Sequence, residues 1–177
     1  DAKEVTIGQY LQFQASANWV FPRCQLFAPQ DHPVTCVTFY DAQAYAAWAG
    51  KKLPTEAQWA RAAYGGPSAS PYFPWGNTWE NGASNTAGGE DGYELTAPPG
   101  SFERDRTWAG CYDMAGNVAE WCAPSADLPA GQRVARGGSW AENEPAALTV
   151  TNRAFFREDY RDCDAGFRLL REWKETP

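Results

Sequence analysis

Three segments in the first third of the chain carry apolar residues at helical spacing, and each follows a threonine that can cap a helix. Thr6 is followed three residues later by Gln9, and this spacing is that of a capping box. Thr38 and Thr55 begin the same kind of segment, and glycines stand at 50 and 65–66, where helices commonly end. We predict helices over residues 7–17, 40–49 and from 56 to the glycine pair.

The middle of the chain has little periodicity from residue 66 to about 132, yet it is rich in aromatic residues. Such a composition argues against disorder, and bound metal ions would be one agent that orders it. Short apolar segments predict strands at 34–39, 133–139, 148–153 and 165–171. Helices first, an irregular middle and strands last indicate the α+β class. We expect a core that includes Trp48, Leu53, Trp59, Trp121, Trp140 and Phe167.

The length and charge of the chain favour a single domain that does not bind nucleic acid. The 177 residues suit one domain, and the formal net charge of −7 would repel a nucleic acid. No apolar run is long enough to span a membrane.

The five cysteines leave the redox compartment open. Cys24 could pair with Cys36 and Cys111 with Cys122, which would leave Cys163 over. Free buried thiols are an equal alternative.

Seven blocks of sequence, in order, resemble the formylglycine-generating-enzyme or sulfatase-modifying-factor domain. They are EVTIGQY (4–10), HPVTCVTFYDAQAYAAWAGKKLPTEAQWARAA (32–63), FPWGN (73–77), EDGYELTAPPGSF (90–102), YDMAGNVAEW (112–121), RVARGGSW (133–140) and AGFRLL (165–170). The resemblance implies one domain over 1–177 with a variant C-type-lectin fold, in which the middle segment is ordered loop. Family members usually begin with a strand ahead of the first block, so that strand is expected to be missing or to come from another segment.

The resemblance also implies two structural calcium sites. Calcium takes six to eight oxygen ligands from carboxylates, amides and main-chain carbonyls. The first site maps onto the side chains of Asn85 and Asp91 with the carbonyls of Thr86 and Tyr93, and the second onto Asp113, the carbonyls of Gly116 and Val118, and Glu120. The alternative interpretation is that these polar residues only form turns and caps.

The enzymes of this family bind copper with two cysteines just after the GGS block. Here the corresponding stretch, Trp140 to Ala147, contains no cysteine. Thiolate is the ligand and redox group of that chemistry, so we expect no formylglycine-generating activity and assign no catalytic residue. The only histidine, His32, is expected to be structural. An enzyme of another type remains an alternative.

The framework RGGSW…NR…R…GFR over 136–168 resembles the variable region of proteins diversified by retroelements, which display a randomised ligand-binding surface on a lectin fold. In those proteins a set of framework residues holds the backbone. The corresponding residues of this chain would be Arg136, Trp140, Arg153, Arg161 and Arg168. The positions between them are permitted products of adenine-directed mutagenesis, and we predict that they form one exposed face: Ala141, Asn143, Ala154, Phe155, Phe156, Tyr160, Asp162 and Cys163. The expected partner is an unidentified protein or other macromolecule. The alternatives are a plain accessory or binding domain and packing roles for the two phenylalanines.

Overall fold

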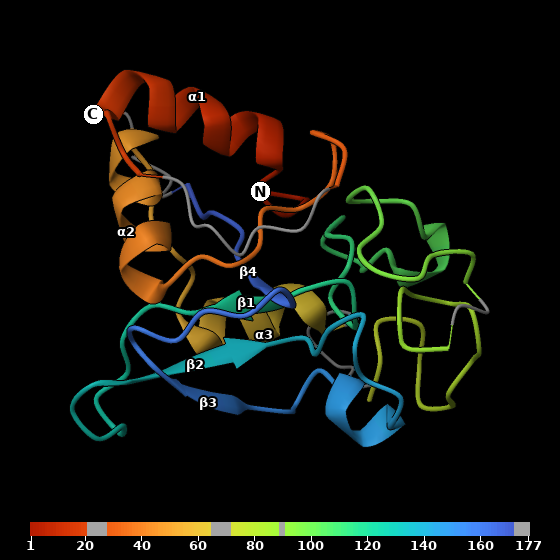
Figure 1. Cartoon of the computed structure of the whole chain (residues 1–177). Coiled ribbons are helices and arrows are strands. Elements are labelled where there is room, and N and C mark those ends of the chain that lie inside the picture. Colours follow the sequence, from red (N-terminus) through yellow and green to blue (C-terminus); the bar gives the residue numbers. More distant parts are fainter. Residues whose placement is uncertain (21–27, 65–71, 89–90, 172–177) are drawn as a thin grey trace, which may run out of the picture.

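The computed structural model describes residues 1–20, 28–64, 72–88 and 91–171. Within them, a small sheet with strand order β3-β2-β1-β4 lies among helices and long loops (Figure 1). β2 pairs antiparallel with β1 and β3, whereas β1 and β4 are parallel. The α+β class is therefore confirmed. In chain order the elements are α1 (Ile7–Ala17), α2 (Phe39–Trp48), α3 (Glu56–Ala63), η1 (Glu103–Asp105), β1 (Ala119–Trp121), β2 (Gln132–Arg136), η2 (Pro145–Leu148), β3 (Ala154–Arg157) and β4 (Ala165–Gly166).

All three helices begin where the threonines predict. The Thr6 amide donates to Gln9 Oε1 at 3.0 Å and the Gln9 amide donates back to Thr6 Oγ1 at 3.3 Å. Thr38 and Thr55 form the same reciprocal boxes. These bonds satisfy amides that have no partner within the helix. α2 begins one residue earlier than predicted, and α3 ends at Ala63; the glycine pair beyond it lies outside the described residues.

The strands follow the sequence pattern less closely. The prediction of a strand at 34–39 is wrong, because Cys36 adopts a left-handed conformation (φ 59°) and Phe39 already opens α2. The strand predicted at 148–153 is also wrong: this segment follows η2 and turns before β3. β2 and β4 overlap their predicted segments but are shorter, and β1 and β3 lie outside all the predicted strands.

Another part of the chain passes close to β4 at Gly166. A Cβ atom at Gly166 would lie 2.6 Å from the Val34 carbonyl oxygen and 2.9 Å from a Val118 methyl group. Only glycine leaves room for this approach. This approach brings the 34–38 segment against the sheet, where Trp121 Nε1 donates to the Val37 carbonyl at 2.9 Å.

The two faces of the sheet bury different partners. Trp121 and Phe156 lie on the face that packs on α1 and α2, and their ring centroids are 5.8 Å apart. The opposite face carries Glu120 and Arg136, and it meets Trp59 of α3. Figure 1 shows α1 and α2 together on one side of the sheet and α3 against it. The sheet therefore separates a large aromatic core from a smaller one.

The predicted core is confirmed for four of its six members. Leu53, Trp59, Trp121 and Phe167 are buried, and Trp140 is half-buried. Trp48 is 44 % exposed, so that prediction is wrong. As the last residue of α2, it covers the edge of the core, where its ring lies 5.6 Å from that of Phe13.

The structure gives different answers for the two predicted cysteine pairs. Cys36 is disulfide-bonded, and Cys24 lies outside the described residues. Cys111 and Cys122 are free thiols, so the pairing suggested for them is wrong, and Cys163 is also free. For the described part of the chain, no helix has the length and apolar character needed to cross a membrane.

A buried ion pair connects segments of the chain that the short strands do not bring together by hydrogen bonds. Arg168 and Glu120 form a bidentate pair with side chains only 4 % and 0 % exposed. Glu120 also accepts from Trp59 Nε1 at 2.8 Å. The Arg168 guanidinium further donates to the Ala2 carbonyl at 3.2 Å and the Tyr112 carbonyl at 2.7 Å. The N-terminal segment, α3, the middle loop and β1 thus meet at one arginine.

We expect Arg168→Met to lower the free energy of unfolding by about 3–5 kcal/mol, because it leaves the Glu120 charge buried without a counterion. Arg157→Met is the matched control: its ion pair with Asp159 is exposed (79 % and 64 %) and should contribute little to stability, because water and salt screen it. Urea unfolding midpoints at constant slope measure both. Equal losses would contradict a special role for Arg168.

Candidate functional site

The two loops expected to bind calcium pack directly against each other. The Asn117 amide donates to the Asn85 carbonyl at 2.9 Å, and Asn85 Nδ2 donates to Asn117 Oδ1 at 2.9 Å. Gly116 has φ 115°, and a Cβ there would lie 2.3 Å from the Asn85 carbonyl oxygen. The glycine is therefore required for the loops to touch.

The first expected ligand set comes together in this structure. The Asp91 carboxylate accepts from the Thr86 amide at 2.7 Å and the Tyr93 amide at 2.9 Å, and so joins three of its four members. The fourth, Asn85, is buried, and its Oδ1 atom has no hydrogen-bond partner. A buried oxygen without a donor is costly unless a cation or water meets it. The residues of this set fit an oxygen-liganded cation.

The second expected set fits less well. Asp113 is buried and accepts from the Gly100 amide at 2.6 Å, and burial raises the pKa of Asp113 to about 6. However, Arg168 and Trp59 occupy both carboxylate oxygens of Glu120. Glu120 is therefore a partner of the central arginine rather than a free ligand.

Two buried acids near this second set were missed by sequence reasoning. Asp105 in η1 is completely buried, and its oxygens face the Met114 and Ala115 amides without completing a hydrogen bond of normal geometry. Burial raises the pKa of Asp105, and the charge of Asp113 raises it further. Glu4 is buried and accepts from Asn117 Nδ2 at 2.8 Å, and burial raises its pKa as well. Nothing in their sequence context distinguishes them from surface acids.

Carboxylates, histidines and thiols alone do not make a metal centre here. In the residues that the structure describes, no group of three such side chains could hold an ion. Any cation in the first or second loop would depend on amide and carbonyl oxygens in addition.

The prediction that framework residues hold the backbone of the 136–168 segment is confirmed for Arg136 and Trp140. Arg136 Nη1 donates to the Thr151 carbonyl at 2.9 Å, and Trp140 Nε1 to the Cys163 carbonyl at 3.2 Å. Arg161 Nη1 donates to the Cys36 carbonyl at 3.1 Å. Arg153 instead binds carboxylates, those of Glu56 at 2.7 Å and Asp127 at 3.1 Å. Side chains that the sequence marked as framework thus fix this irregular segment.

The eight proposed surface residues do not share one exposed face. Phe155 is 51 % exposed, and Ala141 and Asn143 are exposed, but Ala154, Asp162 and Cys163 are half-buried. The prediction is wrong for Phe156 and Tyr160, which stack at 4.5 Å and pack on the aromatic core. Successive side chains of a strand point to opposite faces, so β3 cannot expose Phe155 and Phe156 together.

The pKa values of two free thiols, those of Cys122 and Cys163, are raised. Cys122 is fully buried, and burial raises its pKa. Burial also raises the pKa of the Cys163 thiol, and the neighbouring Asp162 raises it further. A thiol of raised pKa is a poor nucleophile and a poor metal ligand.

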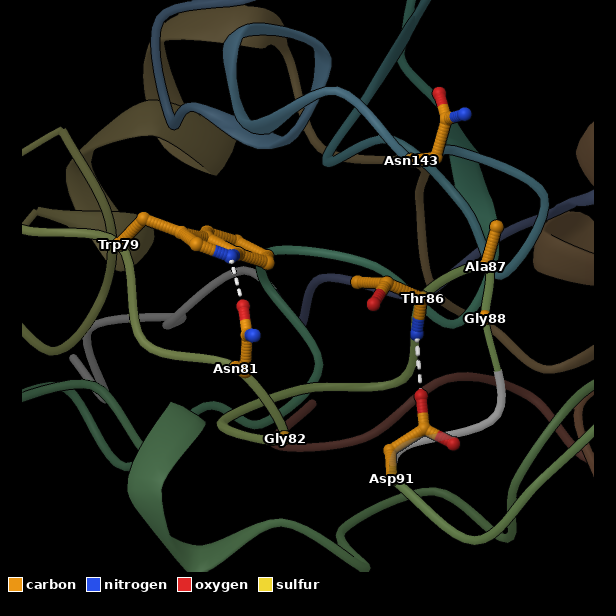
Figure 2. A pocket seen from close by; sticks show the side chains of 8 residues that line it. All are labelled: Trp79, Asn81, Gly82, Thr86, Ala87, Gly88, Asp91 and Asn143. Carbon is orange, nitrogen blue, oxygen red and sulfur yellow. Dashed lines mark hydrogen bonds between the residues drawn. The ribbon is translucent and has the colours of Figure 1, made fainter.

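A small hollow lies between the first oxygen-rich loop and the loop that follows the glycine pair at 137–138. Its volume is about 220 Å³. The Ala87 amide donates to the Glu142 carbonyl at 2.9 Å and holds the two loops together. Figure 2 shows the side chains around it: Trp79, Asn81, Gly82, Thr86, Ala87, Gly88, Asp91 and Asn143.

Sequence comparisons identify formylglycine-generating enzymes, both active and inactive, as relatives of this chain. The chain is 41 % identical over 169 residues to the formylglycine-generating enzyme of Thermomonospora curvata, which covers 78 % of this chain and 55 % of that protein. It is 39 % identical over 150 residues to the inactive C-alpha-formylglycine-generating enzyme 2 of Mus musculus, with coverage of 77 % and 48 %. The chain thus spans about half the length of these two relatives.

Solved structures confirm the C-type-lectin-like fold of the formylglycine-generating-enzyme type. PvdO of Pseudomonas aeruginosa superposes with a TM-score of 0.79 at 26 % identity, over 95 % of this chain and 77 % of that one. Variable protein 1 of Treponema denticola gives 0.69 at 22 % identity over 94 % and 81 %, a likeness of fold alone. The family model for the sulfatase-modifying factor enzyme 1-like domain matches residues 1–173, and the chain therefore belongs to that family.

Proposed function

We propose that this domain is a ligand-binding protein of the kind diversified by retroelements, with exchangeable side chains on a fixed lectin-type scaffold. Its ligand would be a protein or another macromolecule. The observation that carries the proposal is the separation of roles in the 136–168 segment. Arg136 and Trp140 bond to its carbonyls and Arg161 ties it to the Cys36 carbonyl, whereas Ala141, Asn143 and Phe155 are exposed.

This separation matters because a surface can vary only if its side chains do not define the fold. Exposed positions away from caps and buried bonds usually change stability by less than about 0.5 kcal/mol. The three exposed positions meet that condition, and Phe156 and Tyr160 do not, because they pack on the core. The proposed variable surface is therefore narrower than the sequence suggested.

We further propose that the domain does not produce formylglycine. The stretch from Trp140 to Ala147 has no thiol, and the raised pKa values of Cys122 and Cys163 disfavour thiolate. The inactive mouse relative supports this proposal, since it shows that the family includes members without the activity.

Calcium is the cation we propose for the first loop. The unpartnered Asn85 Oδ1 and the Asp91 carboxylate would hold it together with the carbonyls of Thr86 and Tyr93. In the second loop, Asp113 would be joined by the buried carboxylate of Asp105, because the charge of Glu120 is already paired with that of Arg168. The role of either ion would be to staple loops that lack regular hydrogen bonding.

A cysteine-containing sulfatase peptide incubated with this protein and copper(I) should yield no aldehyde above a metal blank, as read by mass spectrometry. The Thermomonospora curvata enzyme serves as the positive control. Aldehyde formation by this chain would contradict the non-catalytic assignment and favour an enzyme related to the formylglycine-generating enzymes.

The gene should lie beside a reverse transcriptase and a near-repeat of its 3′ coding region, and independent copies should differ at Ala141, Asn143 and Phe155. The codon for Phe156 should change less, because its ring is part of the core. Sequencing of the flanking DNA and of several isolates tests this. An invariant segment without a neighbouring reverse transcriptase would leave a plain accessory domain as the better description.

The matched variants for this prediction are Phe155→Ser and Phe156→Ser. The first should change the free energy of unfolding little, within about 0.5 kcal/mol. The second removes a half-buried aromatic ring that packs on the core and should cost more, about 2–3 kcal/mol. Similar losses for both would show that Phe155 is structural and contradict a variable surface on β3.

Calcium should raise the unfolding temperature over that in EDTA, since a ligand of the native state adds RT ln(1 + [L]/Kd), about 2.7 kcal/mol per site at a hundredfold excess. The raised pKa of Asp113, about 6, sets the pH dependence of the second site. Protons compete for that carboxylate below pH 6, so its share of the gain should be full above this pH and fall as the pH drops.

Asp91→Asn should remove the gain from the first site, and Asp105→Asn that from the second. Glu94→Gln, a change of an exposed acid in the same loop, should keep both. A calcium gain that survives all three changes would place the ion elsewhere, and no gain in the unaltered protein would overturn the calcium proposal.

A further inference from the structure

We propose that the hollow of Figure 2 binds one pyranose ring of a sugar, stacked on Trp79 and hydrogen-bonded by Asn81, Thr86 and Asn143. The inference rests on the proposed role as a ligand-binding protein and names the ligand class for one part of its surface. It begins from the shape of the hollow, the fixed position of the indole and the kind of polar groups around it.

The size of the hollow suits one ring. Its volume of about 220 Å³ is below the range of about 300–1,000 Å³ typical of pockets for drug-sized ligands. Trp79 and Asn81 lie on one side and Thr86, Ala87 and Asn143 on the other (Figure 2). A ring that enters between them would touch both loops.

The indole of Trp79 is in place before any ligand arrives. Its Nε1 atom donates to Asn81 Oδ1 at 2.7 Å. The ring also packs edge-on against Phe73, with centroids 5.3 Å apart, and tilted against Trp75 at 5.7 Å. Trp79 remains half-exposed and lines the hollow. A pre-positioned aromatic wall reduces the ordering cost of binding, and its electron-rich face attracts the polarised C–H groups of a flat ligand.

Apart from Asp91, the polar side chains around the hollow are neutral and can form further hydrogen bonds. Asn81 uses its oxygen for Trp79 and keeps its amide NH₂ group as a donor. The Thr86 hydroxyl and the Asn143 amide also line the hollow, and no bond to a described residue engages either side chain. Amides and hydroxyls that can both donate and accept match the hydroxyl groups of a sugar.

The charge of the lining excludes other ligand classes. Among the residues that the structure describes, no lysine or arginine lines the hollow, so a phosphate or carboxylate would find no counterion there. Asp91 is the one charged side chain of this described lining, and both its oxygens accept from backbone amides. A purely apolar ligand would bury these polar groups without partners, which is costly. A neutral, hydroxyl-bearing ring with one apolar face satisfies all these conditions.

The test is NMR of the ¹⁵N-labelled full chain with methyl glycosides of glucose, mannose, galactose and N-acetylglucosamine. At least one should shift the Trp79 indole N–H signal in a saturable way, with a dissociation constant on the order of 1 mM, a weak affinity. The indole of Trp108, which is 77 % exposed but lies outside the hollow, should not shift. Assignment comes from the signal that Trp79→Phe removes.

Asn143→Ala should weaken the affinity at least threefold without changing the fold, because its side chain is exposed and contributes no described bond. Gln43→Ala, the loss of an exposed amide on α2, is the matched control and should leave the affinity unchanged. A glycan array of oligosaccharides ending in the same sugars separates the two sources: binding to the free glycoside indicates a monosaccharide, and binding only to the array indicates a glycan terminus.

Two negative results together would overturn the inference. The first is that the Trp79 signal does not shift with any glycoside at up to about 50 mM, well above the millimolar constants of weak sites. The second is that the protein binds no oligosaccharide of the array. A shift with choline and with no sugar would overturn it in favour of an organic cation. If sugars fail to bind while Ala141 and Phe155 vary between copies, the binding role stands and only this ligand class falls.

Discussion

The pairing of Arg168 with Glu120 is the constraint on which the other segments of this fold depend. A sheet whose central strand has three residues and whose parallel neighbour has two offers too few ladder bonds to fix long loops. The guanidinium reaches two carbonyls in addition to the carboxylate, and the carboxylate reaches α3 through Trp59. A planar group with five donors can hold several directions at once. The polar centre therefore supplies the geometry that regular secondary structure would supply elsewhere.

The same principle recurs nearer the surface. Arg136, Trp140 and Arg161 each donate to a carbonyl of a distant segment, and these carbonyls belong to backbone without ladder partners. A loop held by side chains from below needs little from its own outward side chains. This arrangement explains how a family scaffold can keep its shape while the chemistry at exposed positions changes.

Sequence reasoning succeeded where the signal was local. The threonine caps fixed the starts of α1, α2 and α3 because a capping box involves only four consecutive residues. It failed where distant contacts decide the conformation. Cys36 takes a left-handed backbone in an apolar stretch that looks like a strand, and β1 exists because β2 and β4 meet it from far along the chain.

The site shows the same limit. The resemblance named Asp91, which bonds to the Thr86 and Tyr93 amides of the same expected set, but Asp105 has no sequence signal, since its burial depends on how the middle loop folds over it. Phe155 and Phe156 are identical in type and adjacent, so composition alone could not separate them. Only the register of β3 on β2 shows which ring faces the core.

The position of β3 at the edge of the sheet has a consequence for how copies of the protein behave in concentrated solution. An outer strand with an exposed aromatic ring is a template for pairing with another chain. Phe155 is flanked by Arg153, whose guanidinium lies 5.1 Å from its ring centroid, and by the exposed Arg157. Both arginines are ion-paired, and charged side chains on each side of one apolar group make it costly for a second edge to displace water there, as gatekeeper residues do. Replacement of the side chain at position 155 is then compatible with a monodisperse protein as long as both arginines remain.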